Sequence, residues 1–389
     1  MAPKRKTMCS RERVIACLEH REPDRVPISM SITVNAYKNL KRYLGVEVEE
    51  TLKVGRWTEV NIHPLVAEKF GLDVIWLPMG SPQKKFPRPP ADPTRRVDDW
   101  GVEWALVDLP GGNYYYEMAR HPLADATVKD LDDYPWPDPN DPGRVDGLHE
   151  YYRHIHEDTE FAILTKFGGA IFEQAWYLRG LDRFMVDMVE NPAFVHALLE
   201  HICQVQMGLD TVGLEAAGEY VDILRLSGED MGTQEGPLIS QRMFRGYLRP
   251  YLERLWHYAK AKLVEKNPHG KIMLHSCGSI RTFIPEWIEM GLDVLDPIQP
   301  NARGMSPEGL KADFGSALTF HGGIDAQHVL PFGTVEEVRQ ATRRYIRALA
   351  PGGGYIVAPV HNVQGDVPPQ NLVAMRDAVE EFGYYPIQA

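Results

Sequence analysis

The sequence predicts an α/β fold, a (β/α)8 TIM barrel that forms a single domain over residues 1–389. Eight short apolar runs resemble buried strands and begin near residues 26, 72, 161, 221, 271, 292, 318 and 354. Most of these runs are followed by a helical pattern, and this alternation indicates a parallel sheet that eight units would close. An open doubly wound sheet is the alternative. Its nucleotide-binding forms lack support, because the sequence has no GxGxxG after a first strand and no GxxxxGK[ST].

The N-terminal part predicts two strands and a long Pro-rich excursion. Ser10 is a candidate N-cap for a helix that ends near Glu19. Strands are expected at 26–30 and 72–78. Residues 80–142 are rich in Pro and charge, which argues against long helices and favours a loop and hairpin within the domain. The aromatic residues of this excursion either pack onto the body or form a substrate lid.

From residue 145 onward the pattern becomes regular. Helices are expected at 147–158, 172–188, 192–214, 241–265, 280–290, 335–349 and 371–382. Between them lie strands expected at 161–166, 221–226, 271–274, 292–295, 318–321 and 354–358. This order of elements supports the barrel prediction.

Composition and charge narrow the class of protein. The chain carries a formal net charge of −12, which argues against binding to nucleic acid or to an acidic membrane surface. Its four cysteines are scattered and form no CxxC pair, so a reducing, cytoplasmic location is the simpler expectation. No apolar run has the length of a membrane span, and no signal peptide is expected.

Polar side chains gather after the predicted strands, where a barrel enzyme carries its chemistry. The residues with this placement are Asp73, Trp76, Lys166, Glu229, Asp230, His275, Cys277, Asp296, Gln299, His321, Asp325 and His361. The clustering favours an enzyme that acts on a small molecule. The alternative is that some of these residues, Asp230 and Asp325 among them, only cap helices.

The stretch KIMLHSCG, residues 271–278, carries a candidate metal site. An imidazole at His275 and a thiolate at Cys277 form a compact pair of zinc ligands at the end of a strand. A later strand, GYIVAP, is followed by His361, which would be a third ligand. Asp296, Gln299 or Glu229 would complete or support such a site. The alternative is that both histidines are neutral hydrogen-bonding groups of a pocket.

Glu229 and Asp230 are adjacent carboxylates after the strand at 221–226. Two such groups act as general acid and base when their environments separate their pKa values. They also bind metals, or they cap and orient loops. We expect the capping role for at least one of them.

Several segments spread over nearly the whole length of the chain match a known family. They include RERVIACLEHREPDRVPI, WGVEW, GGAIFEQAWYLRG, SGEDMGTQEGPLISQRMFRGYLRPY, MLHSCGSI, LDVLDPIQP, HGGIDAQHVLPFGTVEEV and GGYIVAPVHNVQGDVPPQN. On these segments the chain resembles the uroporphyrinogen decarboxylase-like superfamily. The resemblance implies a (β/α)8 barrel, in agreement with the strand pattern.

The superfamily implies two chemistries. One branch decarboxylates uroporphyrinogen without a cofactor, with an RQAGRY-type motif and an essential Asp. The other branch comprises zinc methyltransferases that exchange methyl groups with corrinoid proteins and use HxC and a later Cys as ligands. This chain has ISMSITVNAYKN in place of RQAGRY, while Asp73 is a candidate for the decarboxylase Asp. His275 and Cys277 match the methyltransferase pair, and His361 stands in place of the later Cys.

We therefore expect a corrinoid-linked methyltransferase with zinc at His275, Cys277 and His361. Glu229 and Asp230 would support catalysis, and Asp296, Gln299 and His321 would bind substrate or cofactor. The corrinoid would arrive on a partner protein, because the chain has no DxHxxG motif. The alternatives are a metal-free decarboxylase of a tetrapyrrole or other polycarboxylate that uses Asp73, and a barrel that binds corrinoid without catalysis. Whether the protein forms a homodimer is left open.

Overall fold

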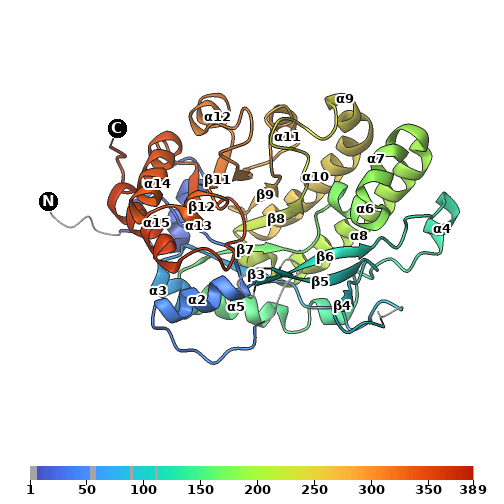
Figure 1. Ribbon diagram of the computed structural model, residues 1–389, viewed down its shortest axis with the longest axis horizontal. Helices are drawn as coiled ribbons and strands as arrows, with labels where there is room; N and C mark the ends of the chain where they lie inside the picture. Colours follow the sequence, from blue (N-terminus) through green and yellow to red (C-terminus); the bar gives the residue numbers. More distant parts are fainter. Residues whose placement is uncertain (1–6, 53–57, 88–90, 110–112, 389) are drawn as a thin grey trace.

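Seven parallel strands form one curled sheet at the centre of the molecule, as a computed structural model shows (Figure 1). The structure describes residues 7–52, 58–87, 91–109 and 113–388. The order across the sheet is β12-β11-β10-β9-β8-β7-β3, and every pair is parallel. The strands are β3 (Val74–Pro78), β7 (Ala162–Lys166), β8 (Ile223–Gly228), β9 (Lys271–His275), β10 (Val294–Ile298), β11 (Thr319–Ile324) and β12 (Tyr355–Pro359).

The eighth predicted strand, at 26–30, does not form a strand of this sheet. Ile28 makes one isolated parallel bridge to Val357 of β12. On the other side, the backbone N–H of Asp73 donates to the carbonyl of Ile28 at 2.8 Å. The segment therefore lies between β12 and β3, the two edges of the sheet. Its ladder is short because Pro27 has no N–H to donate.

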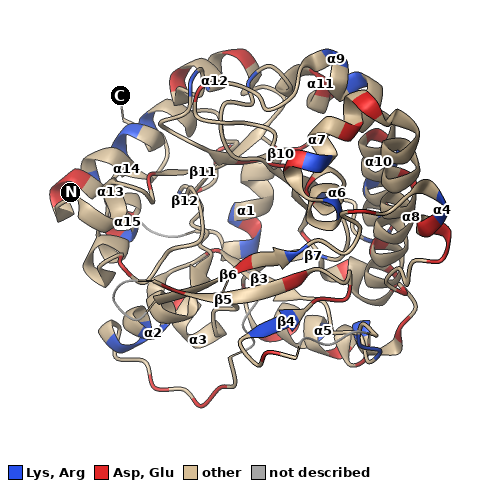
Figure 2. Cartoon of the chain, turned by 45° about the vertical axis from the view of Figure 1, so that its right-hand side comes forward, with Lys and Arg blue, Asp and Glu red and all other residues tan. Residues whose placement is uncertain are grey.

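The helices lie around the outside of the sheet (Figure 2). They are α5 (Leu148–Asp158), α6 (Phe172–Arg179), α7 (Leu181–Glu190), α8 (Pro192–Ala217), α9 (Gln241–Met243), α10 (Arg249–Lys266), α11 (Ile284–Glu289), α12 (Pro307–Phe314), α13 (Val329–Phe332), α14 (Val335–Leu349) and α15 (Pro369–Phe382), with short turns η2 (Pro142–Arg144) and η3 (Gly218–Tyr220). Among the described residues, no helix combines the length and the apolar character that crossing a bilayer requires.

Two predicted helices are each divided. The helix expected at 172–188 breaks at Gly180, whose φ of 91° lies outside the helical region. The helix expected at 241–265 contains a π-helical segment, η4 (Phe244–Leu248), directly before α10. Pro250 follows this segment and has no N–H for the regular helical hydrogen bond, which accounts for the local change in pattern.

The Pro-rich excursion contains more strand than the sequence predicts. It forms an antiparallel sheet of β4 (Arg95–Val97), β5 (Glu103–Leu109) and β6 (Asn113–Arg120), followed by α4 (Val128–Asp132). Trp104 of β5 is buried, and its Nε1 donates to Asp98 at 2.9 Å. Trp100 and Tyr115 instead line the central cavity. Packing onto the body therefore applies to Trp104, while the substrate lid remains a prediction.

A small N-terminal unit packs beside the carboxyl end of β12 and against α15. It comprises β1 (Ile32–Thr33), α2 (Val34–Tyr43), β2 (Glu59–Val60) and α3 (Pro64–Phe70). β1 and β2 pair in antiparallel fashion, and Ile32 also makes a parallel bridge to Val363, just after β12. The chain after β1 is therefore fixed next to the carboxyl end of β12.

Helix α1 (Ser10–Leu18) closes the amino-terminal end of the sheet and lies at the centre of the ring of helices in Figure 2. Val14, Cys17 and Leu18 pack against inward-facing residues of the strands. Those residues are Val74, Ala162, Leu164, Ile223, Met273, Val294 and Ile356. The predicted cap at Ser10 is wrong by one residue. Cys9 caps the helix through its Sγ and Glu12 completes the capping box, which leaves the Ser10 hydroxyl available to another partner.

That partner is Asp73, a buried carboxylate at the amino end of β3 with only 1% of its surface exposed. It accepts hydrogen bonds from Ser10 Oγ at 2.9 Å and Arg13 Nη1 at 2.6 Å. It also accepts from Arg25 Nη2 at 3.1 Å and from the Ile28 backbone at 2.8 Å. The assignment of Asp73 as a catalytic acid is therefore corrected. Its side chain is occupied by structural partners, at the opposite end of the sheet from the cavity described below.

Replacing Asp73 with Ala should destabilise the fold strongly, because Arg13 and Arg25 would remain buried without their shared partner. The expected loss is about 3–5 kcal/mol of unfolding free energy, measured by urea unfolding followed by circular dichroism. Asp377→Ala removes a half-exposed carboxylate that pairs with Arg376 on α15 and should change the unfolding free energy by less than about 1 kcal/mol. Equal effects of the two variants would contradict the structural role of Asp73.

Candidate metal centre and active-site cavity

A cavity of about 570 Å³ opens at the carboxyl ends of the central strands. Its lining includes the ends of β3, β7, β8, β9 and β12, together with α6 and the Pro-rich excursion. In a parallel sheet the strand ends and the loops after them converge at one edge, so residues distant in sequence meet here. His275, Asp296, His321, Asp230 and His361 all contribute to this lining.

The three predicted metal ligands lie together at this edge. His275 is the last residue of β9, Cys277 follows two residues later, and His361 follows β12. One ligand atom from each lies within 4.8 Å of those of the other two. His275 Nε2 lies 3.4 Å from Cys277 Sγ, and the two imidazole rings are 5.8 Å apart between centroids. The structure thus places two imidazole nitrogens and one thiol sulfur close enough together to be ligands of one metal ion.

Asp296 holds two imidazoles at once. Its Oδ2 lies 2.7 Å from His275 Nδ1, and its Oδ1 lies 2.7 Å from His321 Nδ1. Burial by itself raises the pKa of Asp296, but the charges of His321 and His275 and their hydrogen bonds hold that pKa well below its usual range. An ionised carboxylate only accepts, so both Nδ1 atoms donate to it. When either ring loses its second proton, for example to bind a metal, its lone pair is therefore on Nε2.

The three donors of the triad differ in their proton affinity. Desolvation of the imidazole by the surrounding protein, together with the charge of His275, lowers the pKa of His361 to about 4, although the side chain is exposed at the cavity. Burial also acts to lower the pKa of His275, but Cys277 and Asp296 raise it well above the ordinary value. Burial raises the pKa of Cys277. His361 is therefore a neutral ligand at physiological pH, while a metal would displace a proton from the His275–Cys277 pair.

Asp230 and Gln299 position the loop that carries Cys277. Asp230 Oδ1 accepts from the Cys277 backbone N–H at 2.7 Å and lies 3.8 Å from His275 Nε2. Gln299 Oε1 accepts from the Gly278 backbone N–H at 2.7 Å. Gly278 itself has a φ of 87°, and a Cβ there would lie 2.4 Å from the Gly232 backbone. The side chain of Gln299, predicted to bind substrate or cofactor, thus uses its Oε1 to hold this loop.

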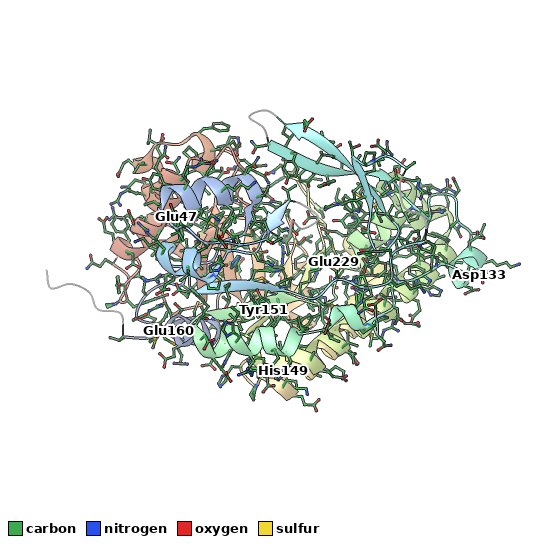
Figure 3. The ribbon with its side chains drawn as sticks, turned by 90° about the horizontal axis from the view of Figure 1, so that it is seen from below. Glu47, Asp133, His149, Tyr151, Glu160 and Glu229 are labelled. Carbon is green, nitrogen blue, oxygen red and sulfur yellow. The ribbon has the colours of Figure 1, made fainter. Side chains whose placement is uncertain are left out.

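Glu229 does not face the cavity. It is fully buried, and its carboxylate accepts from the backbone N–H groups of Ile171 at 2.6 Å and Phe172 at 2.8 Å. It therefore caps the start of α6 from the end of β8, deep in the interior (Figure 3). The catalytic assignment of Glu229 is wrong, and the capping role expected for one of the two adjacent carboxylates applies to this residue.

Glu173 on α6 lines the cavity and was not identified from the sequence. Its carboxyl accepts from Tyr177 Oη at 2.7 Å and from the Asp230 backbone at 3.2 Å. Burial and the charge of Asp230 raise its pKa. A Cβ on Gly228 would lie 2.5 Å from Glu173 Oε1, so only glycine leaves room for this contact. The signal missed was an acidic residue in the first turn of a helix that follows a Gly-Gly turn.

Arg225 was also missed, although the sequence contains a signal for it. It is the one charged residue within the apolar strand β8, ILRLSG. Its guanidinium lies over the ring of Trp76, 5.3 Å from the centroid, and lines the cavity. A charge inside a buried strand requires a partner or a ligand, which makes the residue a candidate binding group.

The Gly-rich loop between β7 and α6 donates hydrogen bonds to two side chains of α8. Gly168 N–H donates to Asp210 Oδ1 at 2.9 Å, and Gly169 N–H donates to Gln206 Oε1 at 3.0 Å. Asp210 Oδ2 is buried without a hydrogen-bond partner among the described residues. Burial raises the pKa of Asp210 to about 7. The loop that leads into α6 therefore depends on a carboxyl group that is costly to ionise.

The stability of the protein should consequently depend on pH through Asp210. Because the folded-state pKa lies above that of the unfolded chain, the stabilisation is fully present below about pH 4 and is lost as pH rises through about 7. Asp210→Asn keeps the acceptor for Gly168 and removes the charge. The melting temperature of this variant relative to wild type should therefore be higher at pH 8 than at pH 5. A difference that is independent of pH would contradict this assignment.

A parallel α/β sheet with a polar cavity at the carboxyl ends of its strands is the architecture of an α/β enzyme. A sequence profile described as "Uroporphyrinogen decarboxylase (URO-D)" matches residues 112–382. The chain belongs to the uroporphyrinogen decarboxylase family, and the resemblance inferred from the sequence is confirmed.

Two known proteins resemble the chain over almost its full length. A uroporphyrinogen decarboxylase from Alkalilimnicola ehrlichii is 21% identical over 386 residues, which cover 95% of this chain and 94% of that protein. The structure of a methyltransferase from Methanosarcina mazei is similar with a TM-score of 0.64 at 18% identity, covering 96% of this chain and 99% of the other. At this level of identity the structural similarity establishes the fold.

Proposed function

We propose that this chain is a methyltransferase of the corrinoid-linked type that holds zinc with His275, Cys277 and His361. The observation that carries the proposal is the convergence of these three ligand atoms within 4.8 Å at the edge of the cavity. We further propose that segment 26–30 completes the central sheet as a (β/α)8 barrel, whose mouth is this cavity. The chain would act in the cytoplasm, and the corrinoid would come from a partner protein.

The residues present fit a zinc ion. Imidazole nitrogen and thiolate sulfur are the ligand types that zinc prefers, and three protein ligands leave a fourth position open for a substrate. The hydrogen bond from His275 Nδ1 to Asp296 directs Nε2 of the same ring toward Cys277. Zinc at such a site lowers the pKa of a bound thiol or polarises a related acceptor group.

The chain's own residues would orient the reacting molecule. Asp230 fixes the backbone of Cys277 and keeps a carboxylate beside the triad. Glu173 places a second, buried carboxyl on the same wall, available to hold or donate a proton. The small molecule would lie among these groups in the cavity, and its open side would face the partner that carries the corrinoid.

The charge of the cavity disfavours the alternative reaction, decarboxylation of a porphyrinogen that carries eight acidic groups. Among the described residues, the lining has cationic side chains at Arg144, Lys166 and Arg225, and the raised pKa of His275 adds an imidazolium. Its carboxyl groups are those of Glu59, Asp99, Glu173, Asp230 and Asp296, of which Glu173 has a raised pKa. Arg144 already pairs with Asp99 at 2.8 Å. The described lining therefore has no excess of cations to match eight acidic groups, and Asp73 lies outside the cavity. A metal-free protein that decarboxylates such a substrate would nevertheless favour this alternative.

Removing a ligand should remove the metal and the activity together. Cys277→Ser and His361→Ala should each reduce zinc from about one ion per chain to below about 0.2, measured by elemental analysis after dialysis. Methyl transfer from methylcobalamin to a small thiol, followed by cobalamin absorbance, should fall by about 100-fold or more.

Two matched variants control for the loss of any Cys or His. Cys9→Ser preserves the cap of α1, because Ser is a good N-cap, and His328→Ala removes an exposed imidazole after β11. Both should retain zinc and activity. Full zinc content in Cys277→Ser would refute the ligand assignment, and full activity in metal-free wild-type protein would refute the role of zinc.

Asp296→Asn should weaken the site without removing a ligand. The amide is neutral, and it can offer an acceptor to only one of the two imidazoles. We expect zinc affinity to fall by about 10- to 100-fold, measured by competition with a chromophoric chelator. An unchanged affinity would show that Asp296 does not orient His275 for the metal.

A further inference from the structure

Arg225 is a partly buried cation with few protein partners among the described residues. It extends inward from β8, and 23% of its side chain is exposed to the cavity that it lines. Among the described residues its only hydrogen-bond acceptor is Asp296 Oδ2, at 3.4 Å from Nη2. Its Nε is buried without a partner. A guanidinium has five N–H donors, so most of the hydrogen-bonding capacity of this group is unused.

The bond to Asp296 does not satisfy Arg225. Asp296 already receives two short hydrogen bonds, from His275 Nδ1 and His321 Nδ1, both at 2.7 Å. The 3.4 Å contact is long for a charge-assisted bond, which normally measures about 2.7–2.9 Å. The partner that Arg225 lacks is therefore expected to come from the cavity side.

A second unsatisfied donor lies in the same lining. Gln174 on α6 is 2% exposed, and its Nε2 has no hydrogen-bond partner among the described residues. The start of α6 lies beside the end of β8, because Glu229 after β8 caps that helix. Buried donors without acceptors are costly, and they occur where a ligand supplies the acceptor.

The shape and charge of the surroundings indicate the kind of acceptor. A carboxylate matches the planar fork of a guanidinium with two parallel hydrogen bonds. A more highly charged group, such as a phosphate dianion, would be repelled more strongly by the Asp230 carboxylate in the same lining. The aromatic side chains of the described residues that line the cavity are Trp76, Trp100, Tyr115, Phe167, Trp176 and Tyr177. They favour a flat, unsaturated ligand over a flexible aliphatic one.

We propose that Arg225 anchors the carboxylate of a planar aromatic carboxylate, which is the small-molecule substrate of this chain, with Gln174 as a neighbouring donor. The inference rests on the proposed function for the role of this molecule in methyl transfer, but not for its binding. Because Arg225 and His275 contact the same oxygen of Asp296, the anchored molecule lies beside the His275–Cys277–His361 triad.

The test uses benzoate as the probe, with wild-type full-length protein in both zinc-loaded and chelator-treated forms. Isothermal titration should show binding with a dissociation constant of about 1 mM or tighter. Benzamide, the neutral analogue, should bind at least about tenfold more weakly because it cannot make the charge-assisted pair. Cyclohexanecarboxylate keeps the charge and should also bind more weakly, since its ring cannot stack on aromatic side chains.

Three variants of the site and one matched control assign the binding to this site. Arg225→Gln should weaken benzoate by about 10- to 100-fold and abolish its preference over benzamide. Arg225→Lys keeps the charge without the fork and should fall between wild type and Arg225→Gln. Arg347→Gln, an exposed position on α14, is the matched control and should bind benzoate like wild type. Trp76→Leu should reduce the preference for benzoate over cyclohexanecarboxylate while Arg225 remains in place.

The outcomes separate this inference from the proposed function. Benzoate that fails to bind, or that binds wild type and a folded Arg225→Gln variant equally, overturns the inference, whatever the zinc content. Arg225-dependent binding in a protein that holds no zinc and transfers no methyl group would support the carboxylate subsite and reject the methyltransferase. Circular dichroism of each variant shows whether it is folded, and Trp76→Leu tests the aromatic wall even if Arg225→Gln does not fold.

Discussion

The site depends on one shared carboxylate, that of Asp296. It receives His275 Nδ1 and His321 Nδ1 on separate oxygens at 2.7 Å each, so the orientation of both rings is set by a single side chain. Asp296 lies within β10, next to His275 on β9 in the parallel register, and this pairing fixes the distance between them. Ring orientation is thus a consequence of strand register, and the position of His275 Nε2 beside Cys277 follows from it.

Two buried acids mark the two ends of the sheet and have different functions. Asp73, at the amino end, is saturated by Ser10, Arg13, Arg25 and a backbone N–H, and α1 covers it. Asp296, toward the carboxyl end, faces a cavity and shares its charge among two imidazoles and a distant guanidinium. The first arrangement leaves no acceptor unused and stabilises the fold. The network around Asp296 leaves neighbouring hydrogen-bond donors without a partner among the described residues, as expected where a ligand completes the network.

Most strands of the sheet and the His-Cys-His triad were predictable from the sequence, because they depend on the pattern of residues that are close along the chain. Apolar runs located β3 and β7–β12, and the HxC spacing with a later His located the triad. The sequence did not distinguish Glu229 from Asp230, because adjacent residues on an irregular strand end face different directions and only packing decides which one caps α6. Asp73 was misassigned because its partners, Arg13 and Arg25, lie far away in sequence. To predict which end of a strand a carboxylate occupies, one must also know the strand boundary to within one residue.

The charge balance of the cavity explains why Arg225 is tolerated inside a strand. If the triad holds a metal cation, as proposed above, that cation would add positive charge beside Asp296 and leave the carboxylate with less capacity to neutralise Arg225 as well. Arg225 would be left with the ring of Trp76 and the solvent of the cavity. A monoanionic substrate offsets this excess, whereas a neutral one does not. The occupied metal site and the carboxylate subsite would therefore favour each other, so that the anion binds more tightly to the metal-loaded protein.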